Sequence, residues 1–215
     1  MSRALAGAVL SGAALLGGQA MAQTAIESKT VLELFTSQGC SSCPAADALL
    51  EKYSKRSDVL ALSVPVDYWD YLGWKDTLAL PENSKRQRQY ARLRGDNQVY
   101  TPQIVVNGVE HAVGSQQWQI DSAISKAAAR LAKLRTSLKF TLEGDFFVIE
   151  VGPAQQAASN KAGILHLAIV KKSETVAIGR GENGGRKVTY FNIVRQMRTV
   201  GTWNGDKLVV RIAKS

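Results

Sequence analysis

The stretch Phe35-Thr36-Ser37-Gln38-Gly39-Cys40-Ser41-Ser42-Cys43-Pro44 decides the fold predicted for this chain, and it holds both of its cysteines. An apolar run, Thr30 to Phe35, precedes it, and a helical pattern, Ala45 to Tyr53, follows it. The predicted order is therefore strand, turn, Cys-x-x-Cys and helix. This order places Cys40 just ahead of a helix N-terminus, where unpaired N–H groups and the helix dipole favour a thiolate. Because the thiolate is the nucleophile, the stretch is interpreted as a redox site.

The first 22 residues have the composition of an export signal. Arg3 is their only charged residue, the run from Ala4 to Gly18 is apolar or small, and Ala20-Met21-Ala22 offers a small-x-small cleavage pattern. We therefore expect a signal peptide over residues 1–22 and a periplasmic or secreted mature protein. Gln23 follows the expected cut where a lipoprotein needs a cysteine, and no second apolar run of about 20 residues is present, so no stable membrane anchor is expected.

Export also bears on the cysteines, since disulfides persist in an oxidising compartment. Secreted proteins that need disulfides for stability usually have several, whereas this chain has two cysteines. A bridge between Cys40 and Cys43 closes a very short loop and removes little entropy from the unfolded chain. The pair is therefore expected to be redox-active, and a purely structural bridge is the alternative.

The composition, with 45% hydrophobic and 21% charged residues, is that of a soluble globular protein with a core. The net charge of +9 permits binding to nucleic acid. Exported proteins rarely meet nucleic acid, so the charge is interpreted as a source of solubility and no such partner is expected. Gly179 to Lys187 lacks the pattern of a phosphate loop, and no cofactor is expected. This stretch is interpreted as a flexible turn, with Arg180, Glu182 and Arg186 as candidates for the rim of the site. The absence of a Gly-x-Ser-x-Gly motif argues against a serine hydrolase.

In the helix after the cysteines, Ala45, Leu49, Leu50 and Tyr53 share the predicted apolar face, and Asp47 lies away from it. A second, almost wholly apolar strand follows at Val59 to Val66 and completes a predicted right-handed βαβ unit.

The segment from Asp67 to Asp76 then holds three acids, two tyrosines and two tryptophans. It leaves the carboxyl end of a parallel strand, the edge at which sites gather in open α/β sheets. We expect it to form a wall of the site, with Trp69 in the cleft and Asp67 or Asp70 as a proton acceptor. An aromatic loop packed on the sheet is the alternative.

The rest of the chain divides into two parts. Up to Leu134, the pattern predicts a basic helix at Pro81 to Arg94, a strand at Gln103 to Val106 directly after Thr101-Pro102, a hairpin turn at Asn107-Gly108 and a long helix at Gln117 to Leu134. Proline at a strand start is a position at which a cis bond can be selected. From Thr136 on, short strands indicate an antiparallel sheet or small sandwich. The strands predicted there are 138–142, 146–151, 164–171, 188–194, 197–203 and 208–212.

The first strand, Cys40-Ser41-Ser42-Cys43-Pro44, the βαβ unit and Thr101-Pro102 before a hairpin and a helix together resemble the thioredoxin fold. The resemblance implies an α/β protein with a thioredoxin-like domain at residues 28–135, followed by a small antiparallel β-rich region at 136–215. In that family the first cysteine attacks, the second resolves and a cis-proline faces the pair. By position, this implies Cys40 as nucleophile, Cys43 as resolving thiol and Thr101-Pro102 as the cis-proline loop.

More narrowly, VLELFTSQGCSSCPAAD, VDYWDYLGWKD, YTPQIVVNG and GRGENGGRKVTYFNIVR look like a secreted bacterial family known only as a domain of unknown function. That family has a thioredoxin-like core and a β-rich C-terminal extension, and it gives no assigned substrate. The chain departs from thioredoxin in its Ser-Ser dipeptide and in Gly39, which stands where thioredoxin has a tryptophan. These departures leave the direction of electron flow open.

Three functions fit these observations. The first is an exported thiol–disulfide oxidoreductase whose partner is a protein or a small-molecule thiol or disulfide. The second is a copper-handling protein, because Cys40, Cys43 and His111 form a soft ligand set that suits Cu(I). The third is a redox-inactive module whose C-terminal β region binds a partner. A four-ligand zinc site is not expected, since no further cysteines exist. The oligomeric state stays open.

Overall fold

The structure is a computed structural model, and it describes residues 29–134, 136–155 and 162–214. The signal peptide expected at residues 1–22 lies outside the described residues. The elements in chain order are β1 (Thr30–Thr36), α1 (Cys43–Ser54), β2 (Val59–Pro65), the short 3-10 helix η1 (Asp70–Leu72), α2 (Pro81–Arg94), β3 (Gln103–Val106), β4 (Glu110–Val113), α3 (Gln117–Leu131), β5 (Leu138–Glu143), β6 (Phe146–Val151), β7 (Gly163–Ala177), β8 (Lys187–Trp203) and β9 (Leu208–Ala213).

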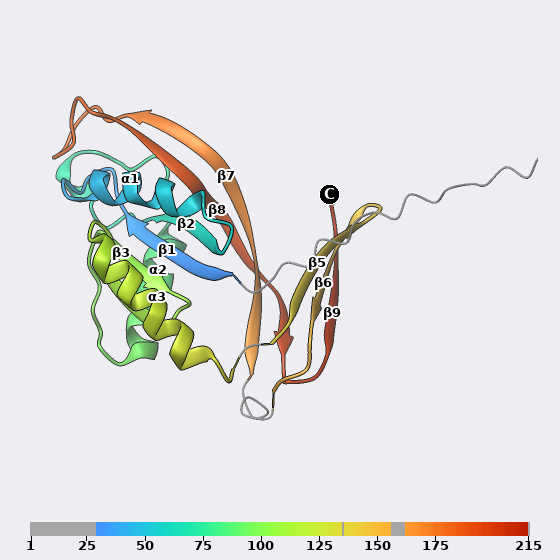
Figure 1. Cartoon of the computed structure of the whole chain (residues 1–215). Coiled ribbons are helices and arrows are strands. Elements are labelled where there is room, and N and C mark those ends of the chain that lie inside the picture. The colour runs from blue at the N-terminus through green and yellow to red at the C-terminus, as the bar shows by residue number, and fades with distance from the viewer. Residues whose placement is uncertain (1–28, 135, 156–161, 215) are drawn as a thin grey trace, which may run out of the picture.

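The described chain forms a mixed six-stranded sheet and a smaller three-stranded one (Figure 1). The strand order of the large sheet is β4-β3-β1-β2-β8-β7, and that of the small sheet is β5-β6-β9. β1 and β2 are parallel, as the βαβ unit requires, whereas β3 and β4 run antiparallel to their neighbours. The protein is therefore α/β, with helices on both faces of the large sheet.

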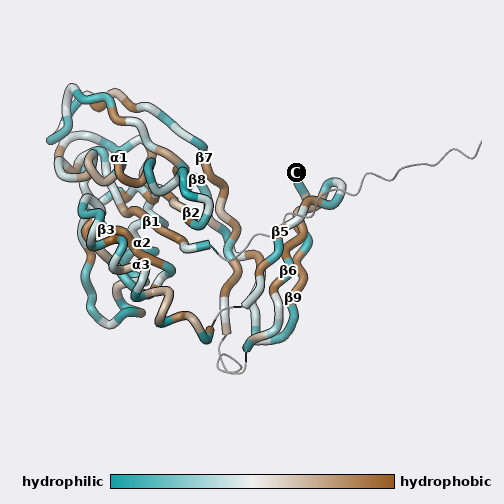
Figure 2. Tube along the Cα trace, in the orientation of Figure 1, coloured by the Kyte–Doolittle hydropathy of each residue, from teal (hydrophilic) through white to brown (hydrophobic). Residues whose placement is uncertain are grey.

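Each face of the large sheet buries its own set of side chains. α1 and α3 cover one face, where Leu34 of β1 and Ile104 of β3 are fully buried between them. Tyr90 of α2 packs on the other face, against Phe35 and its neighbours. Strands covered on both faces read as nearly continuous apolar runs, which explains the sequences of β1 and β2. Figure 2 shows hydrophobic segments along β1 and β2, whereas the loop that joins β7 to β8 is mostly hydrophilic.

Two prolines and one glycine mark helix ends in this layer. Pro44 and Pro81 lie in the first turns of α1 and α2, where a missing N–H costs nothing. Gly95 ends α2 with φ of 81°, a left-handed conformation that glycine adopts without steric cost. In the described part of the chain, no helix is long and apolar enough to cross a membrane.

The C-terminal half adds two strands to the large sheet. β8 runs parallel to β2, with Ser63 opposite Ile193, and pairs along most of its length with β7. The sequence predicted two strands at 188–194 and 197–203, and the structure has one 17-residue strand instead. Arg195 lies at a register shift between them, and its Nη1 donates a hydrogen bond to the carbonyl oxygen of Leu78 at 2.8 Å. A bulge therefore interrupts the pattern of the strand without ending it.

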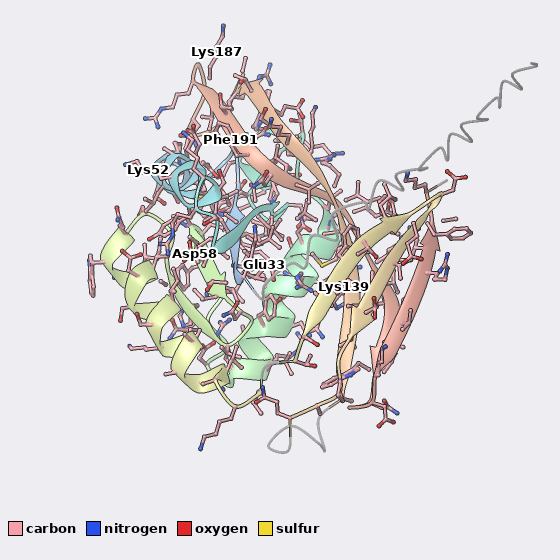
Figure 3. The ribbon with its side chains drawn as sticks, turned by 45° about the vertical axis from the view of Figure 1, so that its right-hand side comes forward. Glu33, Lys52, Asp58, Lys139, Lys187 and Phe191 are labelled. Atoms are coloured by element: carbon pink, nitrogen blue, oxygen red, sulfur yellow. A yellow bond between two sulfur atoms is a disulfide. The ribbon has the colours of Figure 1, made fainter. Side chains whose placement is uncertain are left out.

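One charged side chain of β1 is buried. Glu33 is 3% exposed, and its carboxylate accepts hydrogen bonds from Arg86 Nε at 2.5 Å, from Arg86 Nη2 at 2.9 Å and from the Tyr90 hydroxyl at 2.6 Å. Both partners belong to α2, and Figure 3 shows Glu33 beside this helix. Desolvation and the Glu33 charge both raise the pKa of Tyr90, so its hydroxyl stays protonated and donates. The network fixes α2 against β1.

Candidate functional site

The two cysteines form a disulfide at the start of α1. Cys43 is the first residue of the helix and Cys40 lies in the preceding turn, with their Cα atoms 5.4 Å apart. Ser41 and Ser42 between them are exposed, whereas Cys40 is 1% and Cys43 0% exposed. Ser42 Oγ lies 3.5 Å from Cys40 Sγ. A partner thiol therefore reaches the serines first, and the sulfurs only after a local movement.

The proline loop lies next to the N-terminal turns of α1. The Thr101-Pro102 peptide bond is cis. Gly114 separates the loop from the helix: a Cβ at Gly114 would lie 3.2 Å from both Pro102 Cβ and Ala46 Cβ. The Gly114 N–H also donates to the carbonyl oxygen of Pro102 at 2.8 Å. Pro102 thus lies across Gly114 from Ala46, a residue in the first turn of α1 after Cys43.

Trp69, from the segment 67–76, contacts both the Thr101-Pro102 loop and the turn before Cys40. Its indole Nε1 donates to Thr101 Oγ1 at 2.7 Å. A Cβ at Gly39 would lie 3.0 Å from Trp69 Cβ, so the residue before Cys40 packs directly against the tryptophan. The structure thus brings together Trp69, the proline loop and the cysteine turn, three segments that the sequence placed at one edge of the sheet.

The carboxylates of Asp67 and Asp70 have partners outside the cysteine turn. Asp67 Oδ1 accepts from Ser84 Oγ of α2 at 2.5 Å, and Asp70 Oδ1 accepts from the Asp76 N–H at 3.0 Å. Among the hydrogen bonds of the described residues, neither carboxylate contacts Cys40 or Cys43.

Asp47 is the carboxylate that lies behind the pair. It was expected away from the apolar face of its helix, and this prediction was wrong: Asp47 is 3% exposed, whereas Ala45 is exposed. The reason is that α1 packs against β8 as well as β2, so a second side of the helix is covered. Asp47 follows Cys43 by four residues and lies on the same side of the helix. Thr36 Oγ1 donates to its Oδ2 at 3.2 Å.

The environment of Asp47 favours its protonated form. Desolvation is the main cause that raises its pKa to about 8, and the charge of Asp76 adds to the effect. Asp76 is 4% exposed, accepts hydrogen bonds from the Gln38, Leu78 and Ala79 N–H groups, and has its own pKa raised by burial. Tyr190 of β8 is 2% exposed. Burial is the main cause that raises the pKa of its hydroxyl, and the charges of Asp47 and Asp76 add to the effect. A buried acidic cluster therefore lies beside α1.

Two further site residues come from the loop between β7 and β8. The Asn183 side chain is 1% exposed and donates to the carbonyl oxygens of Gln38 at 3.0 Å and Cys40 at 2.8 Å. Glu182 Oε2 accepts from the Ser41 N–H at 3.0 Å. Glu182 was a candidate for the rim of the site from its place in the glycine-rich stretch, whereas nothing in the local pattern indicated a contact of Asn183 with Cys40.

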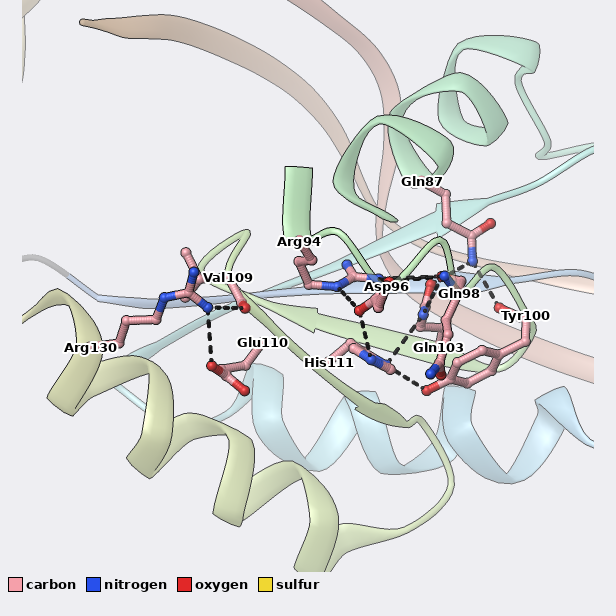
Figure 4. A network of polar contacts seen from close by, with 10 residues as sticks. All are labelled: Gln87, Arg94, Asp96, Gln98, Tyr100, Gln103, Val109, Glu110, His111 and Arg130. Carbon is pink, nitrogen blue, oxygen red and sulfur yellow. Dashed lines mark hydrogen bonds and ion pairs between the residues drawn. The ribbon is translucent and has the colours of Figure 1, made fainter. Parts of the chain in front are cut away.

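His111 lies on β4, in the hairpin that follows the proline loop. Its Nδ1 is 2.9 Å from the Tyr100 hydroxyl and its Nε2 is 3.2 Å from Asp96 Oδ2 (Figure 4). Burial, followed by the charge of Arg94, lowers the pKa of the imidazole. Within residues 29–134, 136–155 and 162–214, no three His, Cys, Asp or Glu side chains are placed to hold a metal ion.

A comparison with protein families gives one finding that covers almost all of the described chain. Residues 31–215 match the family described as "Protein of unknown function (DUF1223)". The chain belongs to the DUF1223 family. An X-ray crystal structure of a protein from Agrobacterium tumefaciens is similar, with 38% sequence identity, a TM-score of 0.74, and coverage of 90% of this chain and 81% of that one. A comparison with curated proteins found no match. The family description assigns no activity, so the site geometry carries the functional argument.

Proposed function

We propose that this DUF1223 protein is an exported thiol–disulfide oxidoreductase that acts through Cys40 and Cys43. In this proposal residues 1–22 direct export to the periplasm or beyond, residues 28–135 form a thioredoxin-like domain, and residues 136–215 form a β-rich extension. The observation that carries the proposal is the position of the cysteine turn among a helix N-terminus, the Thr101-Pro102 loop and a buried carboxyl group. A disulfide that only stabilises the fold does not require a helix N-terminus, a proline loop and a buried carboxyl group around it.

The exchange proceeds in two steps that together move two electrons. A substrate thiolate attacks Cys40 Sγ, so that a mixed disulfide forms and Cys43 leaves as a thiolate. A second substrate thiolate attacks the substrate sulfur of the mixed disulfide, which releases the oxidised substrate and the Cys40 thiolate. The reverse sequence reduces a substrate disulfide: Cys40 attacks, and Cys43 then resolves the mixed disulfide. The reduction potential of the pair relative to the compartment sets the direction.

In this proposal Asp47 is the proton acceptor for Cys43. A base works best when its pKa is close to the operating pH, and burial places that of Asp47 at about 8. Oδ2 of Asp47 accepts a hydrogen bond from Thr36 Oγ1, and Oδ1 is buried with no hydrogen-bond partner among the described residues. The spacing of one helical turn directs both side chains to the same side of α1. Asp67 and Asp70, the acceptors expected from sequence, contribute instead through the wall that holds Trp69.

An exchange assay tests this function. Oxidised full-length protein is incubated with reduced glutathione, and its loss of the disulfide is followed by alkylation and mass spectrometry. Wild type is expected to lose its disulfide. In a parallel incubation of the reduced proteins with oxidised glutathione, Cys43→Ser is expected to attack the glutathione disulfide and to accumulate a mixed disulfide at Cys40, whereas Cys40→Ser is expected to be inactive. Ser37→Ala, which keeps both sulfurs, is the control for a change in the same loop. A Cys40→Ser protein that still catalysed reduction of a disulfide substrate such as insulin as fast as wild type would refute the proposal.

Burial of both sulfurs favours one competing function, the redox-inactive binding module. In such a module the bridge would resist reduction in the native state and be reduced only on unfolding. The two functions differ in the effect of denaturant: native-state exchange requires no unfolding, so its rate is almost unchanged at low urea concentration. A reduction rate that rises with urea in parallel with the unfolded fraction would instead support the module.

A further inference from the structure

The loop between β7 and β8 reaches the cysteine turn from 140 residues further along the chain. Its backbone is closed by four hydrogen bonds: Ile178 N–H to Arg186 O, Gly185 N–H to Ile178 O, Gly184 N–H to Gly181 O, and Arg186 N–H to Asn183 O. Trp74 packs on it, since a Cβ at Gly179 would come within 2.9 Å of the indole ring. The loop is therefore a well-defined turn, and it holds the side chains of Glu182 and Asn183 between Gly181 and Gly184.

Asn183 fixes the backbone on both sides of Gly39. Its amide Nδ2 has two donors, and they are used on the carbonyl oxygens of Gln38 and Cys40. Its Oδ1 accepts from Arg186 Nη1 at 3.2 Å. A buried amide with its donors paired in this way specifies one backbone arrangement, because any displacement leaves polar groups unpaired without water.

Glu182 affects the electrostatic environment of Cys40, whereas Asn183 fixes the backbone conformation around it. The Ser41 N–H belongs to the turn that leads into α1, where free N–H groups are available to stabilise a thiolate. Glu182 occupies this N–H with a carboxylate at 3.0 Å, and this hydrogen bond lowers the pKa of Glu182, so that it is charged at neutral pH. The residue adjacent to Cys40 therefore has a fixed negative charge beside it, which opposes formation of the Cys40 thiolate.

We propose that Glu182 and Asn183 are positioning residues of the redox site: Asn183 fixes the Cys40 turn, and Glu182 makes the pair a weaker oxidant. This inference rests on the proposed exchange function. A thiolate is stabilised only in the reduced pair, so a nearby negative charge favours the disulfide form. In this way the C-terminal region sets the potential of a site whose two sulfurs lie in the N-terminal half.

Glu182→Gln tests the charge, because glutamine keeps the shape and an acceptor for the Ser41 N–H. The full-length proteins are equilibrated with glutathione buffers, and the reduced fraction is measured by alkylation and mass spectrometry. We expect the equilibrium to shift about threefold toward the reduced pair, or about 14 mV at 29.6 mV per tenfold change. The thiolate fraction of Cys40, followed by its ultraviolet absorbance, should rise at a fixed pH. Glu143→Gln, the same charge change in β5, should shift neither quantity.

Two further measurements, at high salt and on Asn183→Ala, distinguish an electrostatic effect of Glu182 on the redox equilibrium from a structural effect on the turn. In about 1 M NaCl the screening length falls to about 3 Å, so the difference between Glu182→Gln and wild type should shrink. Asn183→Ala should speed reduction of the buried disulfide by dithiothreitol at least threefold in protein that retains the wild-type circular dichroism spectrum, because the turn around Cys40 is less fixed.

The outcomes distinguish this inference from the function on which it rests. A wild-type protein that exchanges with glutathione, together with a Glu182→Gln equilibrium equal to wild type, overturns the inference and leaves the proposed function standing. A wild-type disulfide that never exchanges in native protein overturns both.

Discussion

Thr36 Oγ1 donates a hydrogen bond to Asp47 Oδ2 at 3.2 Å, in a place from which water is excluded: Thr36 is 0% and Asp47 3% exposed. This single bond is the only one found for the carboxyl group among the described residues, and the other oxygen is buried without a partner. A carboxylate so poorly solvated favours its protonated form, which is why the pKa of Asp47 rises to about 8. The relationship makes Asp47 costly for folding and useful for proton transfer.

The first prediction concerns stability. In the unfolded chain Asp47 loses its proton near pH 4, and in the folded protein near pH 8, so the folded state binds the extra proton between these values. The contribution of Asp47 to the free energy of unfolding therefore falls as the pH rises from 4 to 8. Asp47→Asn does not titrate, and relative to wild type it should gain roughly 2 to 4 kcal/mol between pH 4 and pH 7.

Urea denaturation at several pH values measures this change. The test is how the difference in the free energy of unfolding between Asp47→Asn and wild type changes with pH. A pH-independent effect of the new amide on stability does not alter that slope. Glu51→Gln, a carboxylate change on the exposed side of the same helix, is the control. Parallel pH profiles for Asp47→Asn and wild type would show that Asp47 titrates normally.

The second prediction concerns the rate of the resolving step. In protein that carries glutathione on Cys40, the Cys43 thiol first loses its proton. The Cys43 thiolate then attacks Cys40 Sγ and releases glutathione. We expect this rate in wild type to rise with pH and to level off near pH 8, and in Asp47→Asn to be slower at pH 7 by roughly 10- to 100-fold. Stopped-flow release of glutathione measures it. If Asp67→Asn or Asp70→Asn slowed release and Asp47→Asn did not, the acceptor expected from sequence would be the correct one.

The third prediction concerns the bond between Trp69 and Thr101. Trp69→Phe removes the 2.7 Å hydrogen bond from Nε1, and Thr101→Val removes its acceptor. Each single change should lower the free energy of unfolding by about 1 to 3 kcal/mol, because a part-buried polar partner is left behind. The double variant should cost less than the sum, with a coupling of about 1 kcal/mol. Additive losses in urea denaturation would show that the two side chains do not interact.

The fourth prediction concerns Glu33. Its removal in Glu33→Ala leaves Arg86 buried without its counter-charge, and we expect a loss of about 3 to 5 kcal/mol. The double variant Glu33→Leu with Arg86→Met replaces both charges by apolar groups and should recover much of that loss. Lys55→Met, which breaks the exposed pair with Glu51, should change stability by less than about 1 kcal/mol. A double variant no more stable than Glu33→Ala would contradict this account.

Much of the fold could be predicted from the sequence where the pattern is local. The helix at Pro81 to Arg94 and the strand at Gln103 to Val106 have the bounds expected from proline, glycine and apolar spacing. The pairing of β8 with β2 could not be predicted, because Ser63 and Ile193 are brought together only by the folded chain. The same long-range packing hid the burial of Asp47, since no local pattern indicates that β8 covers a second side of α1.

The candidate site divides in the same way. The cysteine pair, Trp69 and Thr101-Pro102 could be proposed from motif and strand order. Glu182 was a candidate for the rim of the site. Its contact with Ser41 and that of Asn183 with Cys40 could not be predicted, because both depend on where a loop some 140 residues away returns to the sheet.

The reduction potential of the Cys40–Cys43 pair in the native full chain tests the central claim most directly. Equilibration with glutathione and dithiothreitol buffers, followed by alkylation and mass spectrometry, gives the reduced fraction at each potential. The account predicts a reversible two-electron transition between about −120 and −270 mV, the range of exchange-active pairs. A pair that stays oxidised to below about −300 mV, as structural disulfides do, would contradict it.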